Sequence, residues 1–183
     1  MKRIAVALVV LIFAVAVQAQ APAPKPSPEL KGLEPLIGNW TIDAQAKDSP
    51  SEPEYKLAWT LQCRWILGGF FAEVNHTWKS QRWETTSLEI LGYDPIKKHY
   101  VSRGFGSDGG TWAATATFKD GIFAITATFV NAEGKPSMTG RNTFTFNPDR
   151  MSFSLKGEEE KDGTWWTSMT GKGVKAKAAP KGQ

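Results

Sequence analysis

The chain has 183 residues, of which 41% are hydrophobic and 22% charged, and its formal net charge is +4 at pH 7. The positive excess lies at the two ends, because residues 32–171 carry 14 basic and 17 acidic side chains, a net charge of −3. Nucleic-acid binding requires a concentrated basic face, so we expect no nucleic-acid partner. The single cysteine, Cys63, excludes an internal disulfide, and the fold must therefore depend on its hydrophobic core.

The first residues have the pattern of a secretory signal peptide. Lys2 and Arg3 precede the apolar run 4–17, and Ala19 ends a small-residue cleavage site. We expect cleavage after Ala19, because this apolar run is short for a membrane span. The protein should then be exported, to the periplasm or out of the cell, with no membrane span after cleavage.

The rest of the chain divides into a linker, one domain and a tail. Residues 20–28 contain four prolines and are expected to form a linker. Residues 29–174 are long enough for one domain with a sizeable core. Residues 175–183 form a basic tail that we expect to be disordered. The oligomeric state stays open.

A short helix is expected before the first strand. Ser27 suits the N-cap position, Pro28 the first helical position and Glu29 the first turn. The spacing of Leu30 and Leu33 gives the helix one apolar face. We expect one to two turns that cover one end of the domain.

Beyond this point, apolar and polar residues alternate with a period of two, and turn residues interrupt the pattern every eight to twelve positions. The short links between successive strands favour an antiparallel up-and-down sheet, and closing the sheet removes its exposed edges. The predicted fold class is therefore all-β, a single lipocalin-like barrel of about ten strands. The predicted strands are residues 39–46, 55–66, 70–79, 85–92, 99–106, 111–119, 122–130, 138–146, 151–157 and 164–174.

One hairpin can be predicted residue by residue. Asp120-Gly121 is a preferred two-residue turn, so it fixes the cross-strand partners on either side. One face of this hairpin is apolar throughout, which would be lost with a slip of one residue. The predicted apolar pairs are Phe118–Phe123, Ala116–Ile125, Ala114–Ala127 and Trp112–Phe129.

A second turn is predicted at residues 147–150, where Pro148 occupies the second turn position. A four-residue turn at this place puts Phe146 beside Met151. It also puts Phe144 beside Phe153.

Gly38 and Trp40 stand at the start of the first predicted strand, and this G-x-W pattern resembles the first signature of the lipocalin-like (calycin) barrels. Glycines 92 and 121 follow at hairpin positions. With these features, residues 30–174 resemble a bacterial family of exported, lipocalin-like proteins that is catalogued as a domain of unknown function. The resemblance implies that Trp40 plugs the closed end of the barrel, and it implies no activity.

Projecting the alternation inward predicts a few polar side chains within an aromatic interior, a pattern typical of small-molecule sites. His76 falls on an apolar face, where it is either a satisfied core residue or a ligand contact. Arg103 could equally form a salt bridge with Glu73 or Glu89, or stack on Trp40. The candidate ligand-binding residues are His76, Arg103, Trp59, Trp65, Trp78 and Asn142.

The sequence has no pattern typical of a metal site, a catalytic nucleophile or a phosphate-binding loop. His76, His99 and Cys63 do not form a zinc-binding spacing, and no serine elbow or phosphate-binding glycine loop is present. We therefore expect no metal site and no catalytic residue. Whether the protein is an enzyme stays open at this point, and a binding protein is favoured.

The preferred functional prediction is an exported protein that binds a small apolar or amphipathic molecule in its barrel, with no cofactor. One alternative is a haem barrel with redox or isomerase activity, by analogy with the ten-stranded nitrobindins and with His76 as axial ligand. Nitrobindins place their iron-binding histidine near the C-terminus, where this chain has none. Another alternative is a barrel filled by side chains, which acts through its outer surface.

Overall fold

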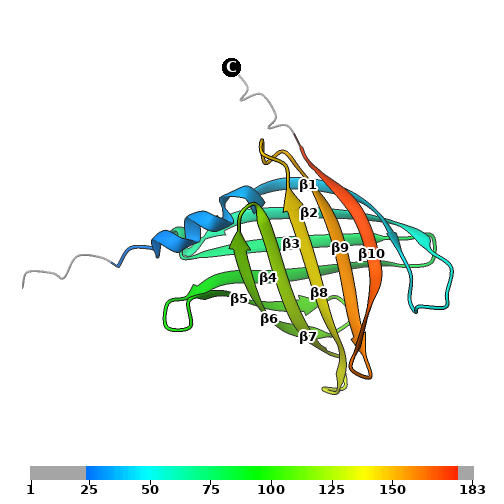
Figure 1. The fold of residues 1–183 in the computed structure, drawn as a ribbon. Coiled ribbons are helices and arrows are strands. Elements are labelled where there is room, and N and C mark those ends of the chain that lie inside the picture. The colour runs from blue at the N-terminus through cyan, green and yellow to red at the C-terminus, as the bar shows by residue number, and fades with distance from the viewer. Residues whose placement is uncertain (1–23, 177–183) are drawn as a thin grey trace, which may run out of the picture.

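Ten antiparallel strands close into one barrel in the computed structural model, which describes residues 24–176 (Figure 1). Each strand pairs with its neighbours in sequence, and β1 closes the barrel against β10. The all-β prediction is confirmed. The expected signal peptide, residues 20–23 of the expected linker and residues 177–183 of the basic tail lie outside the described residues. The strands are β1 (Gly38–Ala46), β2 (Tyr55–Ile66), β3 (Phe71–Lys79), β4 (Glu84–Asp94), β5 (His99–Gly106), β6 (Thr111–Lys119), β7 (Ile122–Val130), β8 (Pro136–Phe146), β9 (Ser152–Lys161) and β10 (Thr164–Lys175).

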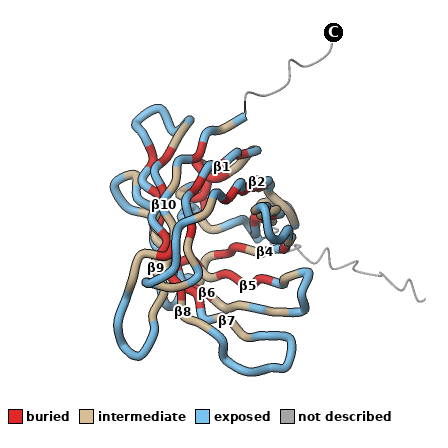
Figure 2. The backbone as a smooth tube through the Cα atoms, turned by 90° about the vertical axis from the view of Figure 1, so that its right-hand side faces the viewer, coloured by how far each residue is buried: buried red, intermediate tan, exposed pale blue. Residues whose placement is uncertain are grey.

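Period-two burial follows most strands, as the alternation predicts. In β2 the buried and exposed residues alternate along most of the strand. Figure 2 shows that buried residues lie along the strands while most of the connecting loops are exposed. The largest boundary difference is in β9, which continues to Lys161. Its last residues are acidic and show no apolar alternation, but they pair on both sides, with β8 and β10.

The Asp120-Gly121 hairpin has the predicted register at all four apolar pairs, from Phe118 opposite Phe123 to Trp112 opposite Phe129. Both turn residues have positive φ, 52° for the aspartate and 78° for the glycine, as this tight turn requires.

The strand register predicted from the second turn is wrong by two residues. Phe146 lies opposite Phe153, and Phe144 lies opposite Leu155. The link is longer because Asn147 N–H bonds to the Ser152 carbonyl, and Arg150 adopts a left-handed φ of 56° within it. A shift of two residues keeps each side chain on its predicted face.

A 3₁₀ helix, η1 (Pro28–Leu36), lies across the end of the barrel where β1 begins (Figure 1). Its leucines at 30, 33 and 36 are buried against the core. One expectation for this helix is corrected, because the Ser27 hydroxyl bonds to the Glu29 carboxylate and caps no backbone N–H. Pro35 lies inside the last turn of the helix.

Trp40 lies under η1 and is 2% exposed. Its indole N–H donates to the Leu36 carbonyl at 2.9 Å, and its ring packs against Phe146 and Phe153. The Lys175 ammonium lies 5.3 Å from the ring centroid. Lys175 therefore occupies the stacking position on Trp40 that was one of the alternatives for Arg103. These contacts close this end of the barrel.

Candidate functional site

Because successive strands run in opposite directions, the links between them alternate between the two ends of the barrel. The η1 end holds the tight β6–β7 turn, whereas the opposite end holds the β1–β2 link (47–54) and the β3–β4 link (80–83). A cavity of about 380 Å³ extends from this second end towards Leu36 of η1. Most of its wall is apolar, with large contributions from Trp59, Trp78, Trp112, Phe123, Phe129 and Phe144.

One wall of the cavity carries a buried polar chain of three side chains. His76 is 6% exposed and Glu89 is 7% exposed. The Trp59 indole N–H donates to His76 Nδ1 at 3.2 Å, and His76 Nε2 lies 3.1 Å from Glu89 Oε2. Because β2, β3 and β4 are neighbours in the sheet, inward residues of the three strands meet on this wall.

The hydrogen bond from Trp59 determines which nitrogen of His76 carries the proton. An indole N–H can only donate, so Nδ1 must accept and cannot carry hydrogen. The proton of the neutral ring therefore lies on Nε2 and is donated to Glu89. If both ring nitrogens of His76 carried hydrogen, the Nδ1–H would point at the indole N–H of Trp59, and two donors would face each other. The contact with Trp59 therefore places the donor nitrogen of His76 at Nε2.

Aromatic rings surround this polar chain. The Trp78 ring stacks on His76 with centroids 5.2 Å apart and an interplanar angle of 15°. Trp59 packs near both rings, with centroids 5.6 Å from His76 and 5.7 Å from Trp78. Such packing holds the imidazole in one orientation.

Cys63 and Glu159 are among the other titratable groups that border the cavity. Burial raises the pKa of the Cys63 thiol to about 12, and the charge of Glu89 adds to the shift. The thiol is therefore protonated and a weak nucleophile at neutral pH. Burial also raises the pKa of Glu159, with a further contribution from Asp48.

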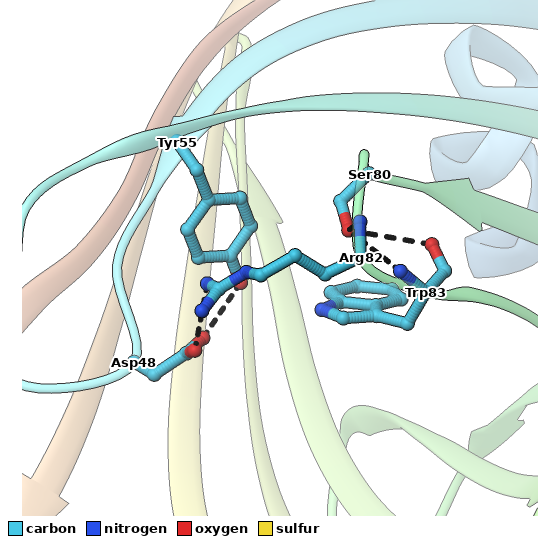
Figure 3. A network of polar contacts seen from close by, with 5 residues as sticks. All are labelled: Asp48, Tyr55, Ser80, Arg82 and Trp83. Atoms are coloured by element: carbon cyan, nitrogen blue, oxygen red, sulfur yellow. Dashed lines mark hydrogen bonds and ion pairs between the residues drawn. The ribbon is translucent and has the colours of Figure 1, made fainter.

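The open end of the cavity is bordered by a polar and aromatic network that joins two links (Figure 3). Tyr55 donates to Asp48 at 2.7 Å, and Arg82 bonds to the same carboxylate at 3.0 Å. The Arg82 guanidinium also lies 4.5 Å from the Tyr55 ring centroid, and Trp83 packs edge-on to that ring. Burial raises the pKa of Tyr55 to about 12, and the hydrogen bond to Asp48 adds to it. The network ties the β1–β2 link to the β3–β4 link over the mouth.

Four of the six predicted binding residues border the cavity, namely Trp59, His76, Trp78 and Asn142. Trp65 does not, although it is on the inward face. It lies at the closed end, where its indole N–H donates to Glu34 of η1 at 3.2 Å.

The placement of Arg103 inside the barrel is wrong, because its side chain is exposed on the outer face. The inner face of β5 carries Tyr100, Ser102 and Gly104 instead. Apolar residues on the outer face of this strand, such as Phe105 at 53% exposed, suggested the opposite orientation. Small inner residues are required here because the Trp112 ring from β6 covers Gly104, where a Cβ would lie 1.9 Å from the indole.

Glu89, Trp83 and Trp112 are site residues that the sequence did not single out. Glu89 is two residues from Leu91 on the inner face of β4, so the alternation alone could have placed it inside. A carboxylate is seldom buried without a partner, and the sequence does not show that His76 faces it from β3.

The histidine does not fit the haem alternative. An axial ligand must offer the iron a free nitrogen lone pair, and both ring nitrogens of His76 are engaged, with Trp59 and Glu89. Within residues 24–176, no group of three or more His, Cys, Asp or Glu side chains is arranged to hold a metal ion.

None of the helices in residues 24–176 is long and apolar enough to cross a membrane.

Comparisons with known proteins agree with the fold. The search of curated proteins found no match. The crystal structure of Rv2717c from M. tuberculosis is similar, with a TM-score of 0.63 and 11% sequence identity, over 84% of this chain and 100% of that chain. At this identity the similarity concerns the fold alone. A family model described as "Protein of unknown function (DUF1579)" matches residues 25–175. Because this match spans most of the chain, the protein belongs to the DUF1579 family.

Proposed function

We propose that the barrel binds one small apolar or amphipathic molecule in its cavity. The observation that carries the proposal is the cavity itself, about 380 Å³, with largely apolar walls and a few polar groups at His76, Glu89 and Asn142. Small-molecule sites have this composition and are commonly in this size range. A barrel filled by its own side chains would leave no such space.

A neutral fluorescent probe, N-phenyl-1-naphthylamine, tests the proposal. We expect saturable binding with an increase in probe emission, because the dye leaves water for an apolar interior. Ala127→Phe should reduce the affinity at least about tenfold, since the added ring occupies space that the ligand needs.

Thr128→Phe is the matched control, because position 128 is exposed on the outer face of the same strand. It should leave the probe affinity unchanged. Far-ultraviolet circular dichroism and the melting temperature check that both variants fold. Equal probe binding by the unaltered protein and the folded Ala127→Phe variant would contradict a site inside the barrel.

We also propose that the protein acts outside the cytoplasm. Lys2, Arg3 and the apolar run that follows support export, and Ala19 is the expected cleavage site. The mass of mature protein recovered from cells should correspond to a chain that begins at Gln20. A mature chain that still begins at Met1 would contradict export by this route.

A further inference from the structure

We infer that the ligand of this cavity carries a protonated amine, which binds at Glu89 while an apolar part fills the rest of the barrel. The inference rests on the proposed binding function and names the chemical class of the ligand. It follows from the hydrogen bonds and charges at the polar wall of the cavity.

The hydrogen bonds of Glu89 leave half of its carboxylate unused. Oε2 accepts from His76, but Oε1 has no partner among the described residues. The side chain is only 9% exposed and borders the cavity. A buried carboxylate oxygen without a donor is costly, so the site favours a ligand that supplies one.

The charge of Glu89 is also uncompensated. The Trp59 N–H points at Nδ1, so His76 can offer Glu89 a single N–H donor, from Nε2. No lysine or arginine in residues 24–176 forms an ion pair with Glu89. The chain of Trp59, His76 and Glu89 therefore offers the cavity a carboxylate oxygen and no basic partner for it among the described residues.

The other charged residues of the lining do not offset this charge. Lys47 is the one basic residue of the described chain that borders the cavity, and its ammonium lies 5.8 Å from the Trp166 ring. Asp48 is paired with Arg82, and Glu158 with Arg141. Glu159 also borders the cavity without a basic partner among the described residues. The interior is thus acidic, which favours a cation and disfavours an anion.

The surroundings of Glu89 suit an ammonium group with N–H donors. Across the strands Glu89 faces Gly104, and the ring of Trp112, which also borders the cavity, covers that glycine. A carboxylate oxygen accepts N–H bonds from an ammonium, and an aromatic face stabilises its charge.

Three ligands with one tail and different heads test the inference: octylamine, octanol and octanoate. Isothermal titration calorimetry at pH 7 measures each affinity for the unaltered protein. We expect octylamine to bind at least about tenfold tighter than octanol, because a charge-assisted hydrogen bond is stronger than a neutral one. Octanoate should bind most weakly.

The variant Glu89→Gln keeps the side-chain size but removes the charge. Its affinity for octylamine should fall about tenfold to that for octanol, and its affinity for octanol should not change. Glu84→Gln is the matched control. This position on the same strand is exposed and paired with Lys79, so all three affinities should be unchanged.

The outcomes separate the inference from the proposed function. Octanol or octanoate binding as tightly as octylamine would overturn the inference and leave the binding function standing, as would an unchanged preference in Glu89→Gln. Saturable binding of none of the three ligands would overturn the proposed function. The affinities of the three ligands for the unaltered protein test the inference even if Glu89→Gln does not fold.

Discussion

Replacing Trp40 by alanine is expected to lower the free energy of unfolding by about 3–5 kcal/mol, as measured by chemical denaturation. The side chain is 2% exposed and joins η1 to the barrel through the hydrogen bond to Leu36. Its ring also contacts the Lys175 ammonium and packs on Phe153 at a centroid distance of 4.9 Å. Removing it leaves a void that the rigid strands cannot fill.

Trp165→Ala is the matched control for this substitution. Trp165 is 38% exposed and stacks with Arg141 on the outer face, so its loss should cost less than about 1 kcal/mol. Equal destabilisation by the two substitutions would show that Trp40 does not hold the closed end together.

His76→Ala is expected to lower the free energy of unfolding by about 3 kcal/mol, since it leaves two buried polar groups without their partner. The Trp59 N–H would lose its acceptor, and Glu89 would lose the one hydrogen-bond donor that it has within residues 24–176. From the sequence pattern alone, which puts His76 on an inward apolar face, the expected effect of His76→Ala is weaker ligand binding without unfolding of the barrel. Its contacts in the structure predict a loss of stability as well.

His99→Ala is the control, because it removes the other histidine of the chain from the part-exposed start of β5. Its effect should stay below about 1 kcal/mol. Melting temperatures measured for both variants decide the question. A melting temperature for His76→Ala that matches the unaltered protein would mean that the buried chain of Trp59, His76 and Glu89 does not stabilise the barrel.

The fold could be predicted because its signals are local. Alternation with a period of two marks each strand, and the turn at Asp120-Gly121 fixes a register that the apolar face then confirms. The turn after Phe146 could not be predicted, because the left-handed conformation of Arg150 lengthens the link and a shift of two residues leaves the alternation unchanged.

Less of the candidate site could be predicted from the sequence, because the site depends on contacts between side chains of different strands. Alternation placed His76 inside, but the partner Glu89 is fixed only by the pairing of β3 with β4. Arg103 was placed on the wrong side because the covering of Gly104 by Trp112 comes from a neighbouring strand. The pairing of strands decides the first point and side-chain volume across the barrel decides the second, and neither has a signal within one strand.

A series of n-alkanols from butanol to dodecanol, titrated by calorimetry, tests the central claim most directly. If the molecule enters the cavity, the affinity should rise about fourfold with each added methylene and stop rising when the chain fills the available volume. Ala127→Phe should shorten the chain length at which the rise stops. The absence of saturable binding for every alcohol, or a rise unaffected by Ala127→Phe, would contradict a ligand site inside the barrel.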